Sequence, residues 1–344
     1  MSDVACHVAY EVHEASQVGE VRRAAIRLAQ DHGFDDVAAG RVALVATELG
    51  TNLVRHASQG RLLLGMVDSQ GVPMIELLSL DQGPGIVNVA ACMADGYSTG
   101  GTPGSGLGAV RRLSNEFDLF SDVPTGTVIM ARLAAQSASR TVRVADESAE
   151  VFAVGAIALA APGEFVCGDA WAVVQQGPLA SAIVADGLGH GPLAREASAA
   201  AIALFQAHAL GSPGHVVERM HEPLRATRGA AILMLKLDAA AHKLTFSGAG
   251  NVVGRLISGV DDRSLATQHG TVGVQIRRLQ DIQYDWPAHA LVVLHSDGLT
   301  TRWHLDKVKG ILQHHPSVIA GWLMRDNCRG RDDATVVVLK RRNG

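Results

Sequence analysis

The sequence predicts an α+β protein of two domains, on three observations. The chain has 344 residues, and at about 150 residues per domain this length favours two hydrophobic cores over one. Helical and strand-like patterns alternate on both sides of residues 136–149, a stretch of small and polar residues typical of a linker. A content of 47% hydrophobic and 19% charged residues excludes a fibrous or disordered chain. We therefore expect domains at residues 1–135 and 150–344.

The first domain is expected to pack helices on a sheet. Apolar residues three and four apart predict helices, and short β-rich runs predict strands. The expected helices are 18–32, 36–56 and 106–116, and the expected strands are 61–67, 74–80, 117–120 and 127–133. This order predicts a layer of helices on one sheet.

The second domain is richer in strand-like runs. These fall at 151–159, 171–175, 180–185, 230–237, 243–249, 290–295 and 334–339, with helical patterns at 192–210 and 215–224. Strands in such number, interrupted by only two helical patterns, favour antiparallel sheets covered by helices. A further short strand at 141–144 is an alternative within the linker region.

Charge and cysteine content narrow the classes of partner. The 30 basic and 34 acidic residues give a net charge of −4, which offers no overall attraction to nucleic acid or an anionic membrane. The four cysteines are far apart and form no C-x-x-C pair, which favours a reduced, cytoplasmic compartment. The N-terminus lacks the basic start and apolar stretch of a signal peptide. The longest uncharged stretch, after Glu196, is broken by His208 and Pro213, so we expect no membrane span.

The segment VALVATELGTNLVRHA combines an apolar and a polar helix face. Glu48, Asn52 and His56 recur every four residues, so a carboxylate, an amide and an imidazole share one line of the helix. This spacing alone is equally typical of a solvated helix face.

Two glycine-rich segments follow this helix. DQGPGI places Asp81 at a strand end, ahead of Gly83 and Gly85, and STGGTPGSGLG precedes a helix. Such a loop brings backbone N–H groups and a helix N-terminus close to phosphates, although each segment alone is also an ordinary turn.

In this order, over residues 10–133, the three motifs resemble the nucleotide-binding fold of the GHKL superfamily. Within it they resemble the serine/threonine kinases and anti-sigma factors of bacterial partner-switching pathways. The resemblance implies a Bergerat α/β sandwich that binds ATP, with Asn52 holding Mg²⁺ and Asp81 reading the adenine. It implies Glu48 as the general base toward a hydroxyl, and His56 as a packing or lid residue. The remaining nucleotide-site residues would be Gly83, Gly85, Gly104, Gly106, Leu107 and Gly108.

Acidic residues recur at expected strand ends in the second domain. They lie in CGDAW, VADGLGHG, LHSDGL and RDDATVVVL. Each one alone is more often a turn residue than a ligand. Packed sheets could bring the set together, however, and carboxylates with water are the ligands that Mg²⁺ and Mn²⁺ prefer. Two bridged ions could activate water against a phosphoester.

The order of these motifs over residues 150–341 resembles the SpoIIE-type branch of the metal-dependent serine/threonine phosphatases. The resemblance implies an αββα sandwich in which Asp186 bridges two ions, assisted by the Gly187 carbonyl. Asp297 and Asp332 would hold the other ion, and Asp169 would bind directly or through water. Asp333 stands where the wider class often has asparagine, so it is not expected to be a ligand. His190 is either a proton donor or a structural loop residue.

Together these resemblances imply a bifunctional partner-switching regulator. A phosphatase using Mg²⁺ or Mn²⁺ would act on phosphorylated Ser or Thr of STAS-domain proteins, and the ATP-binding domain would be a kinase. A sigma-factor or cyclase regulator is a further candidate partner. In one alternative, the first domain is a non-catalytic, nucleotide-gated binding module or anti-sigma factor. In another, ATP is an intramolecular ligand that controls the phosphatase.

Overall fold

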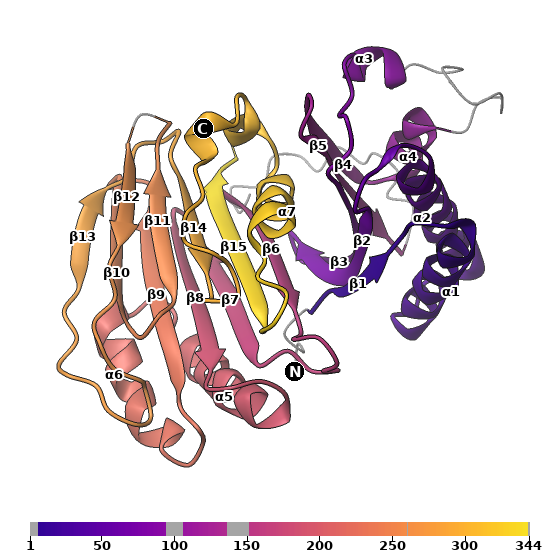
Figure 1. Ribbon diagram of the computed structural model, residues 1–344. Helices are drawn as coiled ribbons and strands as arrows, with labels where there is room; N and C mark the ends of the chain where they lie inside the picture. Colours follow the sequence, from indigo (N-terminus) through magenta and orange to yellow (C-terminus); the bar gives the residue numbers. More distant parts are fainter. Residues whose placement is uncertain (1–5, 94–105, 136–150, 260, 343–344) are drawn as a thin grey trace. The chain divides into compact units, whose positions relative to one another are not determined.

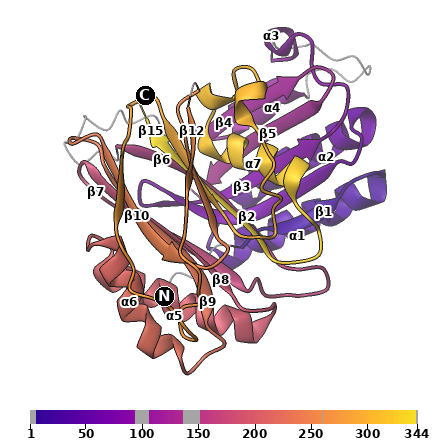
Figure 2. The same cartoon turned by 60° about the vertical axis from the view of Figure 1, so that its left-hand side comes forward.

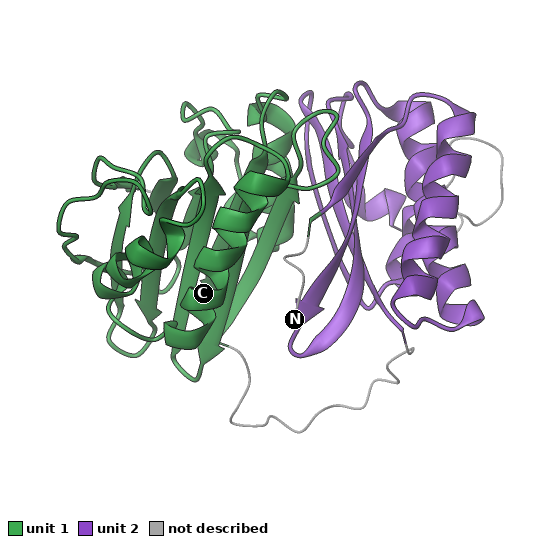
Figure 3. Ribbon diagram, turned by 90° about the horizontal axis from the view of Figure 1, so that it is seen from below, with its two compact units in different colours: residues 1–6, 146–344 green, residues 7–145 purple. Residues whose placement is uncertain are grey.

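The computed structural model describes residues 6–93, 106–135, 151–259 and 261–342. The chain divides into two compact units, residues 7–145 and residues 146–344 together with 1–6 (Figure 3). The expected linker at 136–149, the alternative strand at 141–144 and Gly104 lie outside the described residues.

The unit of residues 7–145 is a two-layer α/β structure. Its sheet has the order β1-β2-β3-β5-β4, with every neighbouring pair antiparallel. Helices α1, α2 and α4 pack on one face of this sheet, and their apolar side chains form the core with it (Figure 1). The elements are β1 (Val8–Glu11), α1 (Ala15–Asp31), α2 (Asp36–His56), β2 (Arg61–Ser69), β3 (Val72–Asp81), α3 (Val89–Cys92), α4 (Leu107–Leu113), β4 (Glu116–Asp122) and β5 (Gly126–Ala134).

Helix α2 is the central element of this core. Its N-terminus is capped by Asp35, whose carboxylate accepts a hydrogen bond of 2.7 Å from the Ala38 N–H. Its stripe of Val42, Val45 and Leu49 is fully buried. Among the described residues, α2 is the single helix long and apolar enough to cross a membrane by length and composition, yet 50% of that stretch is buried within the protein. Burial of one face is the behaviour of a core helix.

The structure shifts several predicted boundaries in this unit by one to three residues, and the end of the third expected helix shows the physical reason for one of them. The helix expected at 106–116 ends at Leu113, and strand β4 begins at Glu116. The Ser114 hydroxyl donates to the Val110 carbonyl at 2.7 Å, and the Asn115 N–H donates to the Arg132 carbonyl at 2.8 Å. The helix therefore ends here because, from Asn115 onward, the backbone N–H and C=O groups form hydrogen bonds with strand β5 instead. The short elements β1 and α3 had no sequence prediction.

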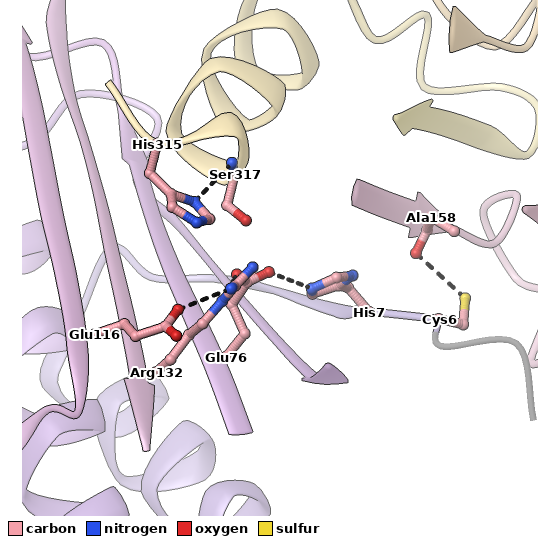
Figure 4. A network of polar contacts seen from close by, with 8 residues as sticks. All are labelled: Cys6, His7, Glu76, Glu116, Arg132, Ala158, His315 and Ser317. Carbon is pink, nitrogen blue, oxygen red and sulfur yellow. Dashed lines mark hydrogen bonds and ion pairs between the residues drawn. The ribbon is translucent and has the colours of Figure 1, made fainter. Parts of the chain in front are cut away.

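A chain of buried charges crosses the sheet of this unit (Figure 4). Glu76 on β3 accepts a hydrogen bond of 2.7 Å from Arg132 on β5 and contacts His7 at 3.2 Å. Arg132 also donates to Glu116 on β4 at 2.9 Å. Burial raises the pKa of Glu76, but the charges and hydrogen bonds of Arg132 and His7 together outweigh burial and hold this pKa far below its usual range. The carboxylate therefore stays ionised although its residue is fully buried.

We expect Arg132→Met to destabilise this unit by about 3–5 kcal/mol, because the substitution leaves Glu76 buried without its cation. The loss should appear in calorimetry of the full chain as a lowered transition temperature. The double variant Glu76→Gln/Arg132→Met should recover most of the loss, and Arg22→Met, at an exposed arginine of α1, should change stability by less than about 0.5 kcal/mol. Equal effects of Arg132→Met and Arg22→Met would contradict this reasoning.

The second unit is an αββα sandwich of two antiparallel sheets. One sheet has the order β13-β10-β9-β8-β7 and the other β12-β11-β14-β15-β6. Helices α5 and α6 cover the first sheet, and α7 lies on β6 and β15 of the second (Figures 1 and 2). The elements are β6 (Phe152–Leu159), β7 (Asp169–Gln176), β8 (Leu179–Gly187), α5 (Pro192–His208), α6 (Pro213–Leu224), β9 (Ala230–Asp238), β10 (Lys243–Ala249), β11 (Val253–Ile257), β12 (Asp262–Leu265), β13 (Ile282–Asp285), β14 (Leu291–His295), α7 (Pro316–Asn327) and β15 (Ala334–Arg341).

Two apolar layers hold this sandwich together. Between the sheets, Phe152 stacks on Trp286 with ring centroids 5.5 Å apart. Beneath α5 and α6, Phe205 and Met220 are fully buried against the first sheet. The α+β class and the αββα arrangement were both predicted, and both are confirmed. Helix α7 and strands β11 to β13 had no sequence prediction.

Candidate functional sites

The first candidate site begins on the polar face of α2. Glu48 and Asn52 are partly buried, whereas His56, one turn further on, is exposed. Burial raises the pKa of the Glu48 carboxyl, and the positive charge of Arg55 opposes this rise. A carboxyl with a raised pKa is better matched to accept a proton near neutral pH than a fully solvated one. The raised pKa is therefore one property that a general base at Glu48 would require.

The loop after β3 is fastened to the end of this helix. The Gln82 N–H donates to the Ser58 carbonyl at 2.9 Å, and the Gly83 N–H donates to Asp81 Oδ1 at 2.7 Å. A Cβ on Gly83 would lie 2.7 Å from the His56 carbonyl oxygen, so the loop approaches α2 as closely as only glycine allows. Asp81 is thereby held beside the C-terminal end of the helix that carries Asn52.

Helix α4 brings the second glycine motif to α2. Gly106 is the N-cap of α4, Leu107 and Gly108 are buried in its first turn, and α4 packs against α2. Thr127 lies opposite Asp81 in the β3–β5 register, and the sequence did not predict it as a site residue. Its hydroxyl lies 3.0 Å from that of Ser121, beside the predicted adenine-reading carboxylate. A pairing partner on a distant strand leaves no signal in the local sequence.

We expect Asn52→Ala and Asp81→Asn each to weaken ATP binding by roughly 10- to 100-fold. A hydrogen bond or ligand contact involving a charged partner contributes about that much. Isothermal titration calorimetry should show the Asn52 effect with Mg²⁺ present and the Asp81 effect with or without it. Asp68→Asn, at an exposed position near the end of β2, is the matched control and should leave affinity unchanged. If both Asn52→Ala and Asp81→Asn bound ATP with the wild-type affinity, the assignment of these residues to a nucleotide site would be wrong.

The second candidate site is built on the paired strands β7 and β8. Asp169 and Asp186 are direct partners in the antiparallel register, so two carboxylates meet across the strands. Asp169 is 1% exposed, and its Oδ2 atom is buried and makes no hydrogen bond. Burial raises its pKa to about 7, although a hydrogen bond from Ser296 opposes the rise. Burial likewise raises the pKa of Asp186 to about 9. The negative charges of four neighbouring aspartates add to this rise, namely those of Asp169, Asp297, Asp332 and Asp333.

Close packing of strand ends brings the other acidic residues to this pair. Three glycines, each adjacent to one of the aspartates, leave no room for a side chain. A Cβ atom placed on Gly168, Gly187 or Gly298 would lie only 2.0–2.6 Å from an atom of Asp333 or Ala194. The segments carrying Asp169, Asp186 and Asp297 therefore pack together on the start of α5 and on the segment before β15. Asp332 caps its own turn by accepting from the Asp333 N–H at 2.9 Å. Asp333 accepts from the Ala161 N–H at 2.9 Å, which gives this carboxylate a structural contact.

The chemistry of the aspartate set suits a hydrated divalent cation. Within the described ranges, no group of three or more His, Cys, Asp or Glu side chains is gathered closely enough to hold a metal ion by itself. Mg²⁺ usually keeps several waters and binds through only one or two carboxylates, so a sparse set suits it. Two facing carboxylates with strongly raised pKa values and an unsatisfied buried oxygen lack a compensating positive charge. A divalent cation would supply that charge.

Two contacts at this site had no sequence prediction. Asn251, in the turn after β10, donates a hydrogen bond of 2.7 Å to Asp297. Glu164 lies 2.7 Å from His190 Nδ1, and both side chains are partly exposed. His190 is thus held by a carboxylate, in an arrangement that suits either a positioned proton donor or a loop tie. Neither partner stood in a recognisable motif, because each comes from a loop that only the fold brings near.

Comparison with protein families gives one match in each unit. Residues 12–133 match the histidine kinase-like ATPase domain, and residues 179–342 match the stage II sporulation protein E (SpoIIE) family. The second match includes Asp186, Asp297 and Asp332, whereas Asp169 precedes it.

Two curated relatives come from Bacillus subtilis (strain 168). The chain is 33% identical over 134 residues to the serine/threonine-protein kinase RsbT, a match that covers 38% of this chain and 96% of RsbT. It is 33% identical over 90 residues to the phosphoserine phosphatase RsbX, which covers 26% of this chain and 45% of RsbX.

Solved structures resemble about half of the chain. One, described as "The bacterial stressosome: a modular system that has been adapted to control secondary messenger signaling", has a TM-score of 0.52 at 25% identity, covering 55% of this chain and 99% of that one. The structure of RsbX in complex with magnesium has a TM-score of 0.50 at 24% identity, covering 55% of this chain and 95% of RsbX, and so shares the fold.

Proposed function

Because the chain belongs to the RsbT-like histidine kinase-like ATPase family through its first unit and carries a SpoIIE phosphatase domain in its second, we propose that it is a bifunctional partner-switching regulator. In this proposal the second unit removes phosphate from Ser or Thr of STAS-domain proteins, and the first unit phosphorylates such a protein with ATP. The observation that carries the proposal is the buried, facing pair Asp169 and Asp186, which lies among strand ends that also bring Asp297 and Asp332 close.

The phosphatase unit would act by positioning and charge compensation. Asp186 would bridge two divalent ions with help from the Gly187 carbonyl, Asp297 and Asp332 would hold one ion, and Asp169 would bind directly or through water. When bound, the ions supply a water of lowered pKa and stabilise the oxygens of the phosphoester. Asn251 would orient the Asp297 carboxylate through its hydrogen bond. His190, oriented by Glu164, would serve as the proton donor to the leaving oxygen.

The kinase-like unit would act through the polar face of α2. Asn52 would hold Mg²⁺ on the phosphates, while Asp81 would accept the adenine amino hydrogen bond. The glycines at 83, 85, 104, 106 and 108, with Leu107, would surround the nucleotide. Glu48, whose raised pKa favours proton acceptance, would take the proton from the incoming hydroxyl.

Opposed activities in one chain require separate substrates or gating. If both units acted on one phosphosite, ATP would be consumed without net change. Distinct phosphosites on STAS-domain proteins, or nucleotide control of the phosphatase, would prevent this cycle. We place the protein in the cytoplasm, because ATP and reduced cysteines belong to that compartment.

The proposal is tested by mass spectrometry of STAS-domain proteins incubated with the full chain. Phosphorylated partners should lose phosphate only when Mn²⁺ or Mg²⁺ is present, and EDTA should block the loss. Unphosphorylated partners should gain phosphate with ATP and Mg²⁺. A panel of STAS-domain proteins showing neither change under these conditions would refute both activities.

A further inference from the structure

A basic hollow adjoins the aspartate set of the second unit. It has a volume of about 530 Å³ and is lined by Thr300, Thr301, Arg302, Arg329 and Arg331. Its two walls are the segment that follows Asp297 and the segment that precedes Asp332. The hollow therefore begins within a few residues of two predicted metal ligands.

Backbone contacts hold the two walls together. The Thr300 N–H donates to the Asn327 carbonyl at 2.9 Å, and the Arg329 N–H donates to the Gly298 carbonyl at 2.8 Å. The Thr300 hydroxyl also donates to the Asn327 side chain at 3.2 Å. The Thr300 and Arg329 backbones are thereby fixed by the fold, and the bond to Gly298 ties one wall of the hollow to the residue after Asp297.

The arginines of the hollow carry uncompensated charge. Arg302, Arg329 and Arg331 are exposed, and none has an ion-pair partner within 4.0 Å among the residues that the structure describes. Their chemistry contrasts with that of Arg255 nearby, which is paired with Asp262. Guanidinium groups bind carboxylates and phosphates through forked hydrogen bonds, and the two threonine hydroxyls add further donors.

We propose that this hollow is a docking subsite for acidic side chains that flank the phosphorylated residue of the protein substrate. The inference rests on the proposed phosphatase function and specifies its substrate class. A phosphoryl group at the aspartates leaves the neighbouring residues of its own chain close to the hollow, because Arg331 directly precedes Asp332 and Arg329 binds the residue after Asp297. Asp or Glu side chains at those substrate positions would satisfy the unpaired guanidinium groups.

The test compares two phosphoserine peptides that differ only in flanking residues, one with Asp and Glu and one with Asn and Gln. Binding to the full chain is followed by fluorescence anisotropy in EDTA, so that no turnover occurs. We expect the acidic peptide to bind roughly tenfold more tightly, as two or three exposed ion pairs predict, and the preference to fall with added salt. Equal binding of the two peptides by the wild-type chain would overturn the inference.

Two charge-reversed variants with the same change in net charge localise the effect. The triple variant Arg302→Glu/Arg329→Glu/Arg331→Glu should lose the preference for the acidic peptide. The matched control Arg219→Glu/Arg277→Glu/Arg278→Glu, at exposed positions on and near α6, should keep it. Equal loss in both variants would show general electrostatic attraction and would also overturn the inference.

Hydrolysis of the same peptides with Mn²⁺ separates this inference from the proposed function. If the wild-type chain releases phosphate from neither peptide but keeps its binding preference, the phosphatase assignment fails and the acidic docking site stands. If it hydrolyses both peptides with equal kcat/KM and binds them equally, the phosphatase assignment stands and the docking site fails.

Discussion

Asp186→Asn is expected to abolish metal-dependent dephosphorylation, with a loss of about a thousandfold or more. The substitution removes the charge that would bridge two cations, and such ions contribute several kcal/mol to the stabilisation of phosphoester transition states. The rate should be measured with a phosphorylated STAS-domain protein and with an aryl phosphate, at saturating Mn²⁺. Asp285→Asn is the matched control, because Asp285 is exposed at the edge strand β13 and pairs only with Lys243 in the described structure.

A thermal shift separates loss of metal from loss of fold. In the metal-free protein, burial and neighbouring negative charges disfavour an ionised Asp186, so its replacement by neutral asparagine should leave the melting temperature unchanged or raise it. Mn²⁺ should raise the melting temperature of the wild-type chain through binding to the folded state, and this rise should shrink in the variant. EDTA-resistant activity at the wild-type rate in Asp186→Asn would overturn the metal assignment.

Local patterns predicted helices with one buried face and strands that are continuous apolar runs, such as β5 and β14. Helix α2 was predicted to its last residue because its apolar stripe and Asp35 cap coincide with its ends. Helix α7 was not predicted, because every residue from Pro316 to Arg325 is buried and the segment shows no polar face to mark a helical period. Strands β11, β12 and β13 are only four or five residues long, too short for an alternation to stand out.

In the candidate sites, the sequence shows the motifs, whereas the contacts between them depend on the fold. The motifs containing Asp169 and Asp186 are visible in the sequence, but their pairing depends on the β7–β8 register. Asn251 and Glu164 reach the site from loops with no motif, so only the three-dimensional structure reveals their contacts. The arginines of the basic hollow likewise lie beside the predicted aspartate motifs, but only the packed structure shows that they line one hollow.

Glu48→Gln is expected to reduce phosphoryl transfer to a STAS-domain partner by roughly a hundredfold or more, the range in which general bases contribute. Glutamine keeps the size and hydrogen-bonding reach of glutamate but cannot accept the proton. Radiolabelled ATP and a phosphatase-dead Asp186→Asn background are required, because the second unit would otherwise erase the product. Glu20→Gln, at an exposed position of α1, is the matched control and should transfer phosphate at the parental rate.

The binding of ATP to the same variant decides between catalysis and regulation by the first unit. Calorimetry should give Glu48→Gln an ATP affinity close to that of its parent, since Asn52 and Asp81 would supply the nucleotide contacts. If the parent with Glu48 intact phosphorylates no partner, yet ATP changes its affinity for STAS-domain proteins, the first unit is a nucleotide-gated binding module. Burial raises the pKa of Glu48, as it would in a catalytic site or in a nucleotide-gated binding site, so the phosphorylation assay decides between the two.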